Sequence, residues 1–352
     1  MKLKRILTVF MSAVISVAAL AACSGQSNTQ PAATEAPSSS AGTEAAETET
    51  AKTEAAETEP GFSADKIGVT YVKSPLNVPS IVEKVKGIFE EAFSEYGLPV
   101  EYSNLTSGPE QTQALASGDI QFLYAVGATS VILSAANDAD IKIISTYSRS
   151  PEAFRLFTGK DGSIQSAEDL KGKKVAGPKG TILHELLASY LAAAGMSEED
   201  VEFVSMGIPD AQAALVGGTV DCALMAGPVA YNMEKDGYQI VTTGEGLVDA
   251  TIVVATSGEF YEKNPLLVKT FLEAQDKIRD YMEENPEEIL EITAKETELS
   301  IDAVKEMFPM YDFNTEITES DVESMKKTEQ FMRDNGMIEN EVNIDDLILR
   351  VE

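Results

Sequence analysis

The residues best suited to chemistry in this sequence lie at two expected helix starts, around Ser107 and Gly127. The Ser107 hydroxyl can accept a hydrogen bond from the free N–H groups of a first helical turn. Pro109 fits that turn because its missing N–H costs nothing there. Residues 120–126, between the two starts, are apolar and rich in β-formers, which predicts a buried strand. Helix N-termini attract anions, so this stretch predicts one wall of a cleft for a small molecule.

The same reasoning nominates the loops that follow the other expected strands, because ligands of open α/β sheets bind outside the carboxyl ends of strands. The candidates are Lys73, Ser74, Pro75, Asn77, Ser107, Gly108, Ala125, Val126, Gly127, Ala128, Lys179, Gly180, Thr181, His184, Pro209, Asp210, Met225, Ala226 and Pro228. Helix starts at Gly108, Gly127 and Thr181 would direct free N–H groups at an oxyanion. Each start would contribute about 0.3–1 kcal/mol to anion binding when exposed.

Several candidates have a purely structural alternative. Ser107 and Thr181 can serve only as helix caps. Lys73 and Lys179 can be solvated loop lysines that touch no ligand. His184 lies about one helical turn after Thr181, so it faces the cleft, lies on the surface or packs inside the protein.

Five further side chains need an interpretation. Arg149 could reach the cleft from the chain segment near residue 150. Tyr71 and Tyr124 lie in expected strands, which favours a place in the core over contact with a ligand. Met225 offers a soft apolar wall. Cys222, also in an expected strand, is interpreted as a small buried hydrophobe rather than a nucleophile.

Strands that alternate with helices must position these loops. We expect strands at residues 67–72, 98–102, 120–126, 141–146, 154–158, 173–176, 201–204, 220–225, 239–242 and 251–256, with helices at 80–96, 129–136, 182–194 and 211–216 between them. From residue 264 the pattern is helical to the end of the chain. This alternation predicts sheets dominated by parallel strands and covered by helices on both faces.

The composition excludes several classes of function. A chain of 352 residues suits two lobes with appendages. Its formal net charge of −31 argues against nucleic acid or an anionic membrane surface as a partner. One histidine and two cysteines cannot form a Cys2His2 zinc site. Because one of the cysteines, Cys23, lies in the leader, no intramolecular disulfide is expected.

Residues 1–22 have the organisation of a signal peptide. Lys2, Lys4 and Arg5 precede an apolar run over residues 6–19, and Leu-Ala-Ala-Cys follows, ending at Cys23. An ordinary signal peptide and a membrane anchor are the alternatives, although the apolar run is short for the roughly 20 residues that a spanning helix needs. The Leu-Ala-Ala-Cys sequence resembles the bacterial lipobox. That resemblance implies cleavage before Cys23 and a diacylglycerol on its thiol, with fatty acyl chains such as palmitate.

Residues 23–64 predict a disordered tether. The segment is built of Ala, Thr, Glu, Ser and Pro, and its AAETETAKTEAAETEP stretch nearly repeats itself. It has too few large apolar side chains to offset the entropy of ordering. Its glutamates repel one another, so the tether would hold a globular module away from the cell surface.

Four segments together resemble a known family: SGPEQTQALASGDIQF, SAEDLKGKKVAGPKGT, IPDAQAALVGGTVDCALMAGP and EFYEKNPLLVKTFLEA. The chain is similar to extracytoplasmic solute-binding proteins of ABC importers, in the sulfonate, nitrate, taurine and thiamine-precursor group. The resemblance implies the type II periplasmic-binding-protein fold, with two α/β lobes and a ligand cleft between them. Lobe 1 would comprise residues 66–158 and 249–352, and lobe 2 residues 159–248. The lobes would close on the ligand by a hinge motion.

The resemblance also implies a function without catalysis, cofactor or metal. A monomer, anchored by Cys23 to the outer face of the bacterial cytoplasmic membrane, would capture a small organic anion and deliver it to permease and ATPase subunits. Two departures concern the ligand. The aromatic residue that sulfonate binders often carry before Pro228 is absent, and no acidic residue for a taurine amine stands in residues 251–254. A thiamine precursor or aromatic ligand is the alternative, and a thiamine-pyrimidine-synthase-like enzyme or a surface sensor is a more distant one.

Overall fold

The computed structural model describes residues 61–351 of the chain. The signal peptide predicted at residues 1–22, Cys23, and the predicted tether as far as residue 60 lie outside the described residues. Phe62 packs its ring edge-on to Tyr96 at 5.2 Å between centroids. The N–H of Ser63 donates to Oδ1 of Asn264 at 2.9 Å. Residues 62 and 63 therefore contact the globular part of the chain.

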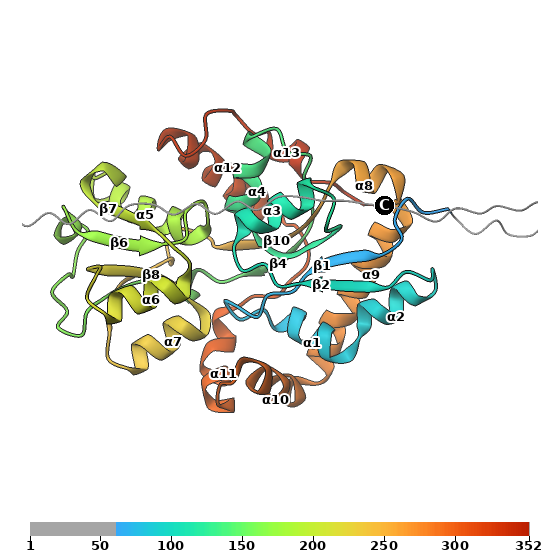
Figure 1. The fold of residues 1–352 in the computed structure, drawn as a ribbon, viewed down its shortest axis with the longest axis horizontal. Helices are drawn as coiled ribbons and strands as arrows, with labels where there is room; N and C mark the ends of the chain where they lie inside the picture. Colours follow the sequence, from blue (N-terminus) through green and yellow to red (C-terminus); the bar gives the residue numbers. More distant parts are fainter. Residues whose placement is uncertain (1–60, 352) are drawn as a thin grey trace, which may run out of the picture. The chain divides into compact units, whose positions relative to one another are not determined.

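The described chain forms two α/β lobes, each built on its own sheets (Figure 1). We call the first lobe the one that contains a parallel β1–β2 pair and a three-stranded sheet of order β3–β10–β4. Its strands are β1 (Ile67–Thr70), β2 (Val100–Ser103), β3 (Leu123–Gly127), β4 (Lys142–Arg149) and β10 (Thr251–Thr256). A parallel bridge between Val69 and Phe122 joins β1 to the residue before β3. The two sheets of the first lobe are thus edge to edge.

The second lobe is built on one five-stranded sheet of order β7–β6–β8–β5–β9. Its strands are β5 (Phe154–Thr158), β6 (Lys174–Gly177), β7 (Glu202–Ser205), β8 (Cys222–Ala226) and β9 (Gln239–Thr243). The chain enters this lobe between β4 and β5 and leaves it between β9 and β10. Two crossing segments therefore join the lobes, and residues 154–158, expected at the end of the first lobe's N-terminal part, pair with strands of the second lobe.

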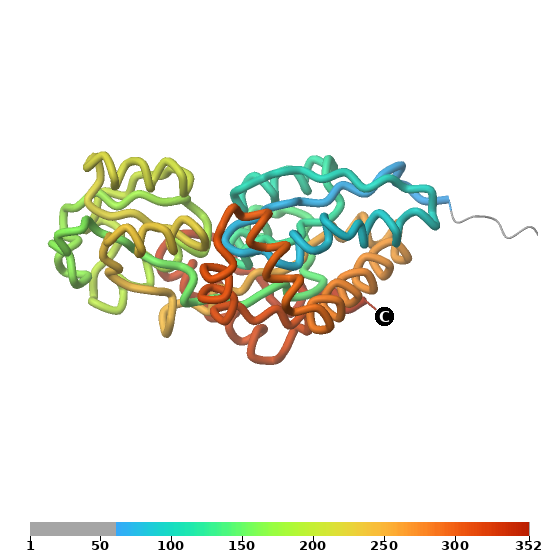
Figure 2. Tube along the Cα trace, turned by 90° about the horizontal axis from the view of Figure 1, so that it is seen from below, coloured from blue at the N-terminus to red at the C-terminus, as the bar shows by residue number. Residues whose placement is uncertain are grey.

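Helices pack against these sheets and between them. They are α1 (Val78–Lys86), α2 (Ile88–Ser94), α3 (Gly108–Ala116), α4 (Ala128–Ala136), α5 (Ile182–Ala193), α6 (Ile208–Val216), α7 (Gly227–Lys235), α8 (Gly258–Lys263), α9 (Pro265–Glu284), α10 (Pro286–Thr297), α11 (Ile301–Met307), α12 (Glu319–Asp334) and α13 (Ile344–Leu347). Seen from below in Figure 2, the orange-to-red helices of the C-terminal part lie with the first lobe. Of these, α11 contacts α7 of the second lobe.

Parallel strands dominate both lobes, as predicted, but each lobe also contains one strand of opposite direction. In the first lobe β10 runs antiparallel to both of its neighbours, β3 and β4. In the second lobe β5 runs antiparallel to β8 and β9. Both β5 and β10 follow directly after a crossing segment. The chain enters each of these two strands from the other lobe. Each therefore runs antiparallel to the neighbouring strands, which helices connect within the same lobe.

One predicted helix is two. The apolar spacing over residues 80–96 predicts a continuous helix, but the structure has α1 and α2 separated by Gly87. Gly87 has φ of 69°, a left-handed conformation that ends α1, and its N–H donates to the Glu83 carbonyl at 2.7 Å. The apolar positions of both helices still reach one core, since Phe89 and Phe93 are fully buried.

The side chains of β8 alternate between two cores, as the period of two of a strand requires. Cys222, Leu224 and Ala226 belong to the core that includes α5. Ala223 and Met225 belong to a second core on the other side, with residues of α6 and α7. Alternation therefore decides which β8 side chains can approach the cavity described next.

Candidate functional site

A cavity of about 400 Å³ lies between the two lobes. Its walls come from both of them, at the loops after β1, β2, β3, β6, β7 and β8 and at the helices that follow. The lining residues are Tyr71, Val72, Lys73, Ser74, Pro75, Asn104, Thr106, Ser107, Gly108, Gln111, Ala125, Gly127, Ser130, Phe154, Pro178, Thr181, Ile182, Leu183, Gly207, Ile208, Pro209, Ala226, Val229 and Ile252. This volume falls within the range of small-molecule sites in proteins.

The ends of β1 and β2 supply much of the first lobe's wall. These strands are parallel neighbours and end at the register pair Thr70 and Ser103. Tyr71 and Ser74 follow β1, while Asn104 and Thr106 follow β2, and all four line the cavity. The position agrees with the rule that ligands bind outside the carboxyl ends of parallel strands.

The start of α3 forms the adjoining part of this wall. Ser107 caps the helix in a capping box, because its hydroxyl accepts from the Glu110 N–H at 3.4 Å while Glu110 accepts from the Ser107 N–H at 3.3 Å. Gly108 must be a glycine here, since a Cβ would lie 2.2 Å from Oγ of Ser130 on α4. This close approach brings the starts of α3 and α4 together at the cavity.

The second lobe contributes a wall of different character. Phe154, Ile182, Leu183, Ile208 and Val229 line the cavity with apolar side chains. Its single lining hydroxyl, that of Thr181, donates to the Pro178 carbonyl at 2.8 Å. It therefore serves its own loop rather than capping α5 as the sequence suggested.

The positive charge at the cavity is already paired. Lys73 is the lining residue with a formal charge, and its Nζ donates to the Glu296 carbonyl oxygen at 2.7 Å. The same Nζ lies 3.4 Å from the Glu296 carboxylate. An anion in the cavity would therefore meet hydroxyl, amide and backbone N–H donors rather than an unpaired cation.

The structure brings about half of the predicted site residues to this cavity. Those that line it are Lys73, Ser74, Pro75, Ser107, Gly108, Ala125, Gly127, Thr181, Pro209 and Ala226. Those that do not line it are Asn77, Val126, Ala128, Lys179, Gly180, His184, Asp210, Met225 and Pro228. Contact of the lining residues with a ligand stays a prediction.

His184 is a packed histidine, which settles the alternative left open by the sequence. It is buried, its Nδ1 accepts from the Gly180 N–H at 3.3 Å, and its Nε2 lies 3.0 Å from Oε1 of Glu198. Its ring packs on Phe203 at 4.7 Å between centroids. The Gly180 carbonyl in turn accepts from the Ser130 hydroxyl at 2.8 Å. His184 thus holds a loop that contacts the other lobe.

Other predicted residues are displaced for identifiable reasons. Asn77 is buried and uses its amide to bond the Val72 and Ser74 carbonyls, both at 2.9 Å, so it shapes the loop after β1. Met225 faces the α6 and α7 core, opposite to its neighbour Ala226. Lys179 and Asp210 are exposed, while Ala128 is buried and Pro228 is partly buried without lining the cavity.

Arg149 does not reach the cavity. Its guanidinium donates to Oδ2 of Asp321 at 2.6 Å and to the Asn314 carbonyl at 3.0 Å, so its charge is used inside the first lobe. Cys222 is fully buried in β8, and burial raises the pKa of its thiol to about 12. The thiol is therefore protonated, as expected for a buried hydrophobe rather than a nucleophile.

Tyr71 lies at the cavity, although the sequence favoured a place in the core. The sequence favoured the core for both Tyr71 and Tyr124, but only Tyr124 is buried there, while Tyr71 lines the cavity. Strand β1 ends at Thr70, so Tyr71 already belongs to the loop. Asn104 and Thr106 were missed, although the same strand-end rule applied to β2 would have found them.

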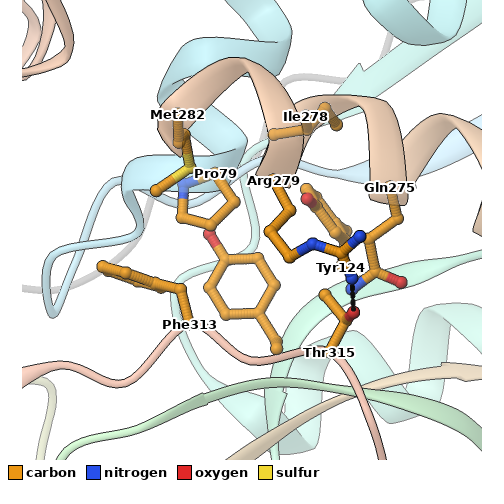
Figure 3. Close-up of a pocket in the computed structure, with 9 residues that line it drawn as sticks. Pro79, Tyr124, Gln275, Ile278, Arg279, Met282, Phe313 and Thr315 are labelled. Carbon is orange, nitrogen blue, oxygen red and sulfur yellow. Dashed lines mark hydrogen bonds between the residues drawn. The ribbon is translucent and has the colours of Figure 1, made fainter. Parts of the chain in front are cut away.

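A second hollow of about 10 Å³ lies beside Tyr124 (Figure 3). Pro79, Ile278, Met282 and Phe313 surround it with apolar atoms. A volume of this size holds about one water molecule. It is too small for an organic solute, so the cavity between the lobes is the candidate site.

A family model described as NMT1/THI5 like matches residues 75–289 of the chain. The chain belongs to the NMT1/THI5-like family. The matched residues include both crossing segments and every lining residue except Tyr71, Val72, Lys73 and Ser74. The family match thus covers most of the cavity as well as the second lobe.

Relatives of this NMT1/THI5-like chain have names that describe binding of a solute. A Bacillus subtilis protein named for binding aliphatic sulfonates is 27% identical over 80% of this chain and 85% of its own length. The taurine-binding periplasmic protein of Escherichia coli is 29% identical over 60% of this chain and 65% of its own length. Neither name describes an enzyme.

Comparison with solved structures identifies the fold. The alkanesulfonate-binding protein SsuA from Xanthomonas axonopodis pv. citri, bound to MOPS, superposes with a TM-score of 0.75 at 19% identity. The match covers 82% of this chain and 99% of that chain. The fold of this NMT1/THI5-like chain is therefore the predicted type II periplasmic-binding-protein fold.

Residues 61–351 contain neither a membrane-spanning helix nor a cluster of metal-binding side chains. No helix among them is long and apolar enough to cross a membrane. Within the same residues, no three His, Cys, Asp or Glu side chains gather so that they could hold a metal ion.

Proposed function

We propose that this protein is the solute-binding component of an ABC importer and captures a small organic anion of the sulfonate type. The observation that carries the proposal is the cavity of about 400 Å³, because residues of both lobes line it. Relatives named for binding aliphatic sulfonates and taurine support the same class of solute. Their binding names also favour capture of a solute over catalysis.

Neutral donors would bind the anion in this proposal. Hydroxyl and amide side chains at the ends of β1 and β2 lie beside the start of α3. Hydrogen bonds from neutral donors to an ionised acceptor contribute about 1.5–3 kcal/mol each. The N-terminus of α3 adds a favourable dipole. Such a site needs no unpaired lysine or arginine.

Closure of the lobes would enclose the solute. Contacts between the lobes flank the cavity in this structure: the Ser130 hydroxyl donates to the Gly180 carbonyl, and Oε1 of Glu185 accepts from Thr328 at 2.8 Å. Oε2 of the same buried Glu185 accepts from Thr129. Opening of the cleft would break these bonds, and closing would reform them around a desolvated ligand. A permease would then recognise the closed form.

The remaining parts of the proposal concern location and partners. The lipobox-like Leu-Ala-Ala-Cys sequence supports acylation of Cys23 and attachment to the outer face of the cytoplasmic membrane. Permease and ATPase subunits would be the partners, and one copy of this chain would suffice for capture. The periplasmic name of the Escherichia coli relative supports an extracytoplasmic location.

Calorimetry and thermal unfolding of the full chain with a panel of sulfonates, carboxylates and nitrate test the function. A solute at about 100 times its Kd should raise the free energy of unfolding by roughly 2.7 kcal/mol. Thr106→Val, which removes a lining hydroxyl, should weaken binding, whereas Ser117→Ala at the exposed end of α3 should not. If no organic anion binds the full chain, the proposed function is wrong.

A further inference from the structure

The two walls of the cavity differ in chemistry. Every lining residue of the second lobe except Thr181 has a side chain without a polar group: Phe154, Pro178, Ile182, Leu183, Gly207, Ile208, Pro209, Ala226 and Val229. The Thr181 hydroxyl is bonded within its own loop. All other polar lining side chains belong to the first lobe. The cavity therefore has one polar wall and one apolar wall.

The polar wall holds donors that the protein itself does not use. Tyr71, Ser74, Asn104 and Thr106 line the cavity, and their side chains make no hydrogen bond within the described residues. Burial, followed by the charges of Glu296 and Glu83, raises the pKa of the Tyr71 hydroxyl, so it stays protonated and able to donate. A ligand that displaces water from these groups must supply acceptors, because leaving buried polar groups unpaired is unfavourable.

Among residues 61–351 no acidic side chain lines the cavity, and this bears on the kind of ligand. Lys73 is the sole charged lining residue among the described residues, and Glu296 already pairs it. A ligand ammonium group enclosed here would find no lining carboxylate among the described residues, and burying an unpaired charge is strongly unfavourable. The lining thus disfavours zwitterions such as taurine.

The apolar wall and the volume point to a bulky ligand. A cavity of about 400 Å³ is far larger than a single sulfonate group with a short chain. A small ligand would leave the remaining space to water at about 30 Å³ per molecule, held against Ile182, Ile208 and Val229. Filling that space with apolar atoms is favourable in proportion to the apolar area removed from water.

We propose that this cavity takes an amphiphilic organic anion without an amine. Its oxyanion head accepts hydrogen bonds from the wall formed by Tyr71, Ser74, Asn104 and Thr106. Its body, one or two rings or a branched chain in size, is buried against the apolar wall of the second lobe. The inference rests on the proposed function, since it takes the solute to be an anion captured between the lobes.

Calorimetry on the full chain with methanesulfonate, taurine, benzenesulfonate and 1-naphthalenesulfonate tests this inference, with 1-naphthoate as the carboxylate arm. The expected result is a Kd at least tenfold lower for 1-naphthalenesulfonate than for methanesulfonate, with a negative heat-capacity change and weaker binding of taurine. The carboxylate arm shows whether the head group is a sulfonate or any oxyanion. Equal or tighter binding of methanesulfonate or taurine would overturn the inference and leave the proposed function standing. Absence of binding by every anion would overturn both.

Matched variants on helix α6 distinguish the contribution of the apolar wall to binding from that of the polar wall. Ile208→Thr in the apolar wall should weaken 1-naphthalenesulfonate binding about tenfold and leave methanesulfonate nearly unchanged. Val216→Thr, on the same helix α6 but exposed, is the control for helix propensity and folding. Thr106→Val in the polar wall should weaken all sulfonates by a similar factor. If Ile208→Thr and Val216→Thr bind 1-naphthalenesulfonate alike, with equal melting temperatures, the assignment of the apolar wall is wrong.

Discussion

Glu83 lies on α1 with 1% of its surface exposed, and its Oε1 accepts from the Tyr102 hydroxyl at 2.6 Å and from the Phe89 N–H at 3.3 Å. Burial raises the pKa of its carboxyl from 4.5 to about 8, and the charge of Glu90 adds to the rise, while the Tyr102 hydrogen bond opposes it. At neutral pH this carboxyl is therefore mostly protonated in the folded protein and ionised in the unfolded chain.

This difference predicts a loss of stability as the pH rises from 4.5 to about 8. Over that window the folded protein keeps a proton that the unfolded chain has lost, so the free energy of unfolding falls with pH. One such group contributes at most about 1.4 kcal/mol per pH unit. Glu83→Gln should flatten the slope in urea unfolding between about pH 5 and about pH 8. Glu91→Gln, exposed on α2, should not change it. The same slope in wild type and Glu83→Gln would contradict this assignment.

The pairing of Lys73 with Glu296 predicts a gain of function. Glu296→Gln removes the carboxylate 3.4 Å from Nζ and frees the lysine charge at the cavity. Partly exposed ion pairs contribute up to about 1 kcal/mol, so the variant should bind a sulfonate about two- to fivefold more tightly. Glu306→Gln is the control, because it unpairs Lys235, which does not line the cavity. Weaker sulfonate binding in Glu296→Gln would show that Glu296, rather than Lys73, supports the site.

At the scale of elements, the start of α7 packs against the loop after β1 in the other lobe. A Cβ on Gly227 would lie 1.7 Å from the Pro75 carbonyl oxygen. Since this is a backbone atom, the clash can be relieved only by moving the lobes apart. Gly227 also has φ of 61°, so any larger residue is strained there as well.

Gly227→Ala should therefore hinder closure and weaken ligand binding by at least tenfold. Gly218→Ala is matched to it, because Gly218 has φ of 69° but nothing within 4 Å of the added Cβ. Both variants should lose about 1–2 kcal/mol of stability to backbone strain. Only Gly227→Ala should lose affinity in calorimetry and show a larger radius of gyration with ligand in X-ray scattering. Equal affinity in the two variants would show that this contact does not limit closure.

Local signals in the sequence were enough to predict most elements and the strand-end position of the cavity. Ser107 and Thr318, for example, are hydroxyl caps followed by an acidic residue, and both form capping boxes. Long-range relations were not predictable in this way. The antiparallel direction of β10 depends on where the chain re-enters the first lobe, which no local spacing records.

The prediction of individual site residues has the same limit as the prediction of long-range relations. The strand-end rule nominated Met225 and Ala226 together, but alternation in β8 turns only Ala226 toward the cavity. A shift of one residue in the expected strand end changes which neighbour lines the site. Lys73 lines the cavity, but its pairing with Glu296, more than two hundred residues later, appears only in the folded chain.

At the scale of the whole molecule, the full chain has a formal net charge of −31 and contains a cavity proposed to take an anion. The long-range field of the protein should oppose the approach of such a ligand, and salt should screen that field over about 8 Å at physiological ionic strength. The association rate of 1-naphthalenesulfonate is therefore expected to rise by up to a few-fold when salt is raised from low to physiological concentration. Neutral 1-naphthol is the control and should show no such rise. A fall of the rate with salt would mean that a local positive potential dominates at the cavity mouth.

Attachment to the membrane is the last property that belongs to the whole chain. The lining residues among those described lie between Tyr71 and Ile252, whereas the proposed acylation site, Cys23, precedes the described residues. Capture and anchoring should therefore be separable.

Cys23→Ala should release the protein into the medium or leave its leader uncut, while the Kd for a sulfonate stays that of the wild type. Ser24→Ala, one residue on, should keep both the anchor and the affinity. Fractionation and mass spectrometry of the N-terminus provide the measurement. Normal processing and membrane attachment of Cys23→Ala would refute acylation and leave the solute-binding proposal unaffected. Uptake should fall in the released variant, because a tethered binding protein stays at a high effective concentration near its permease.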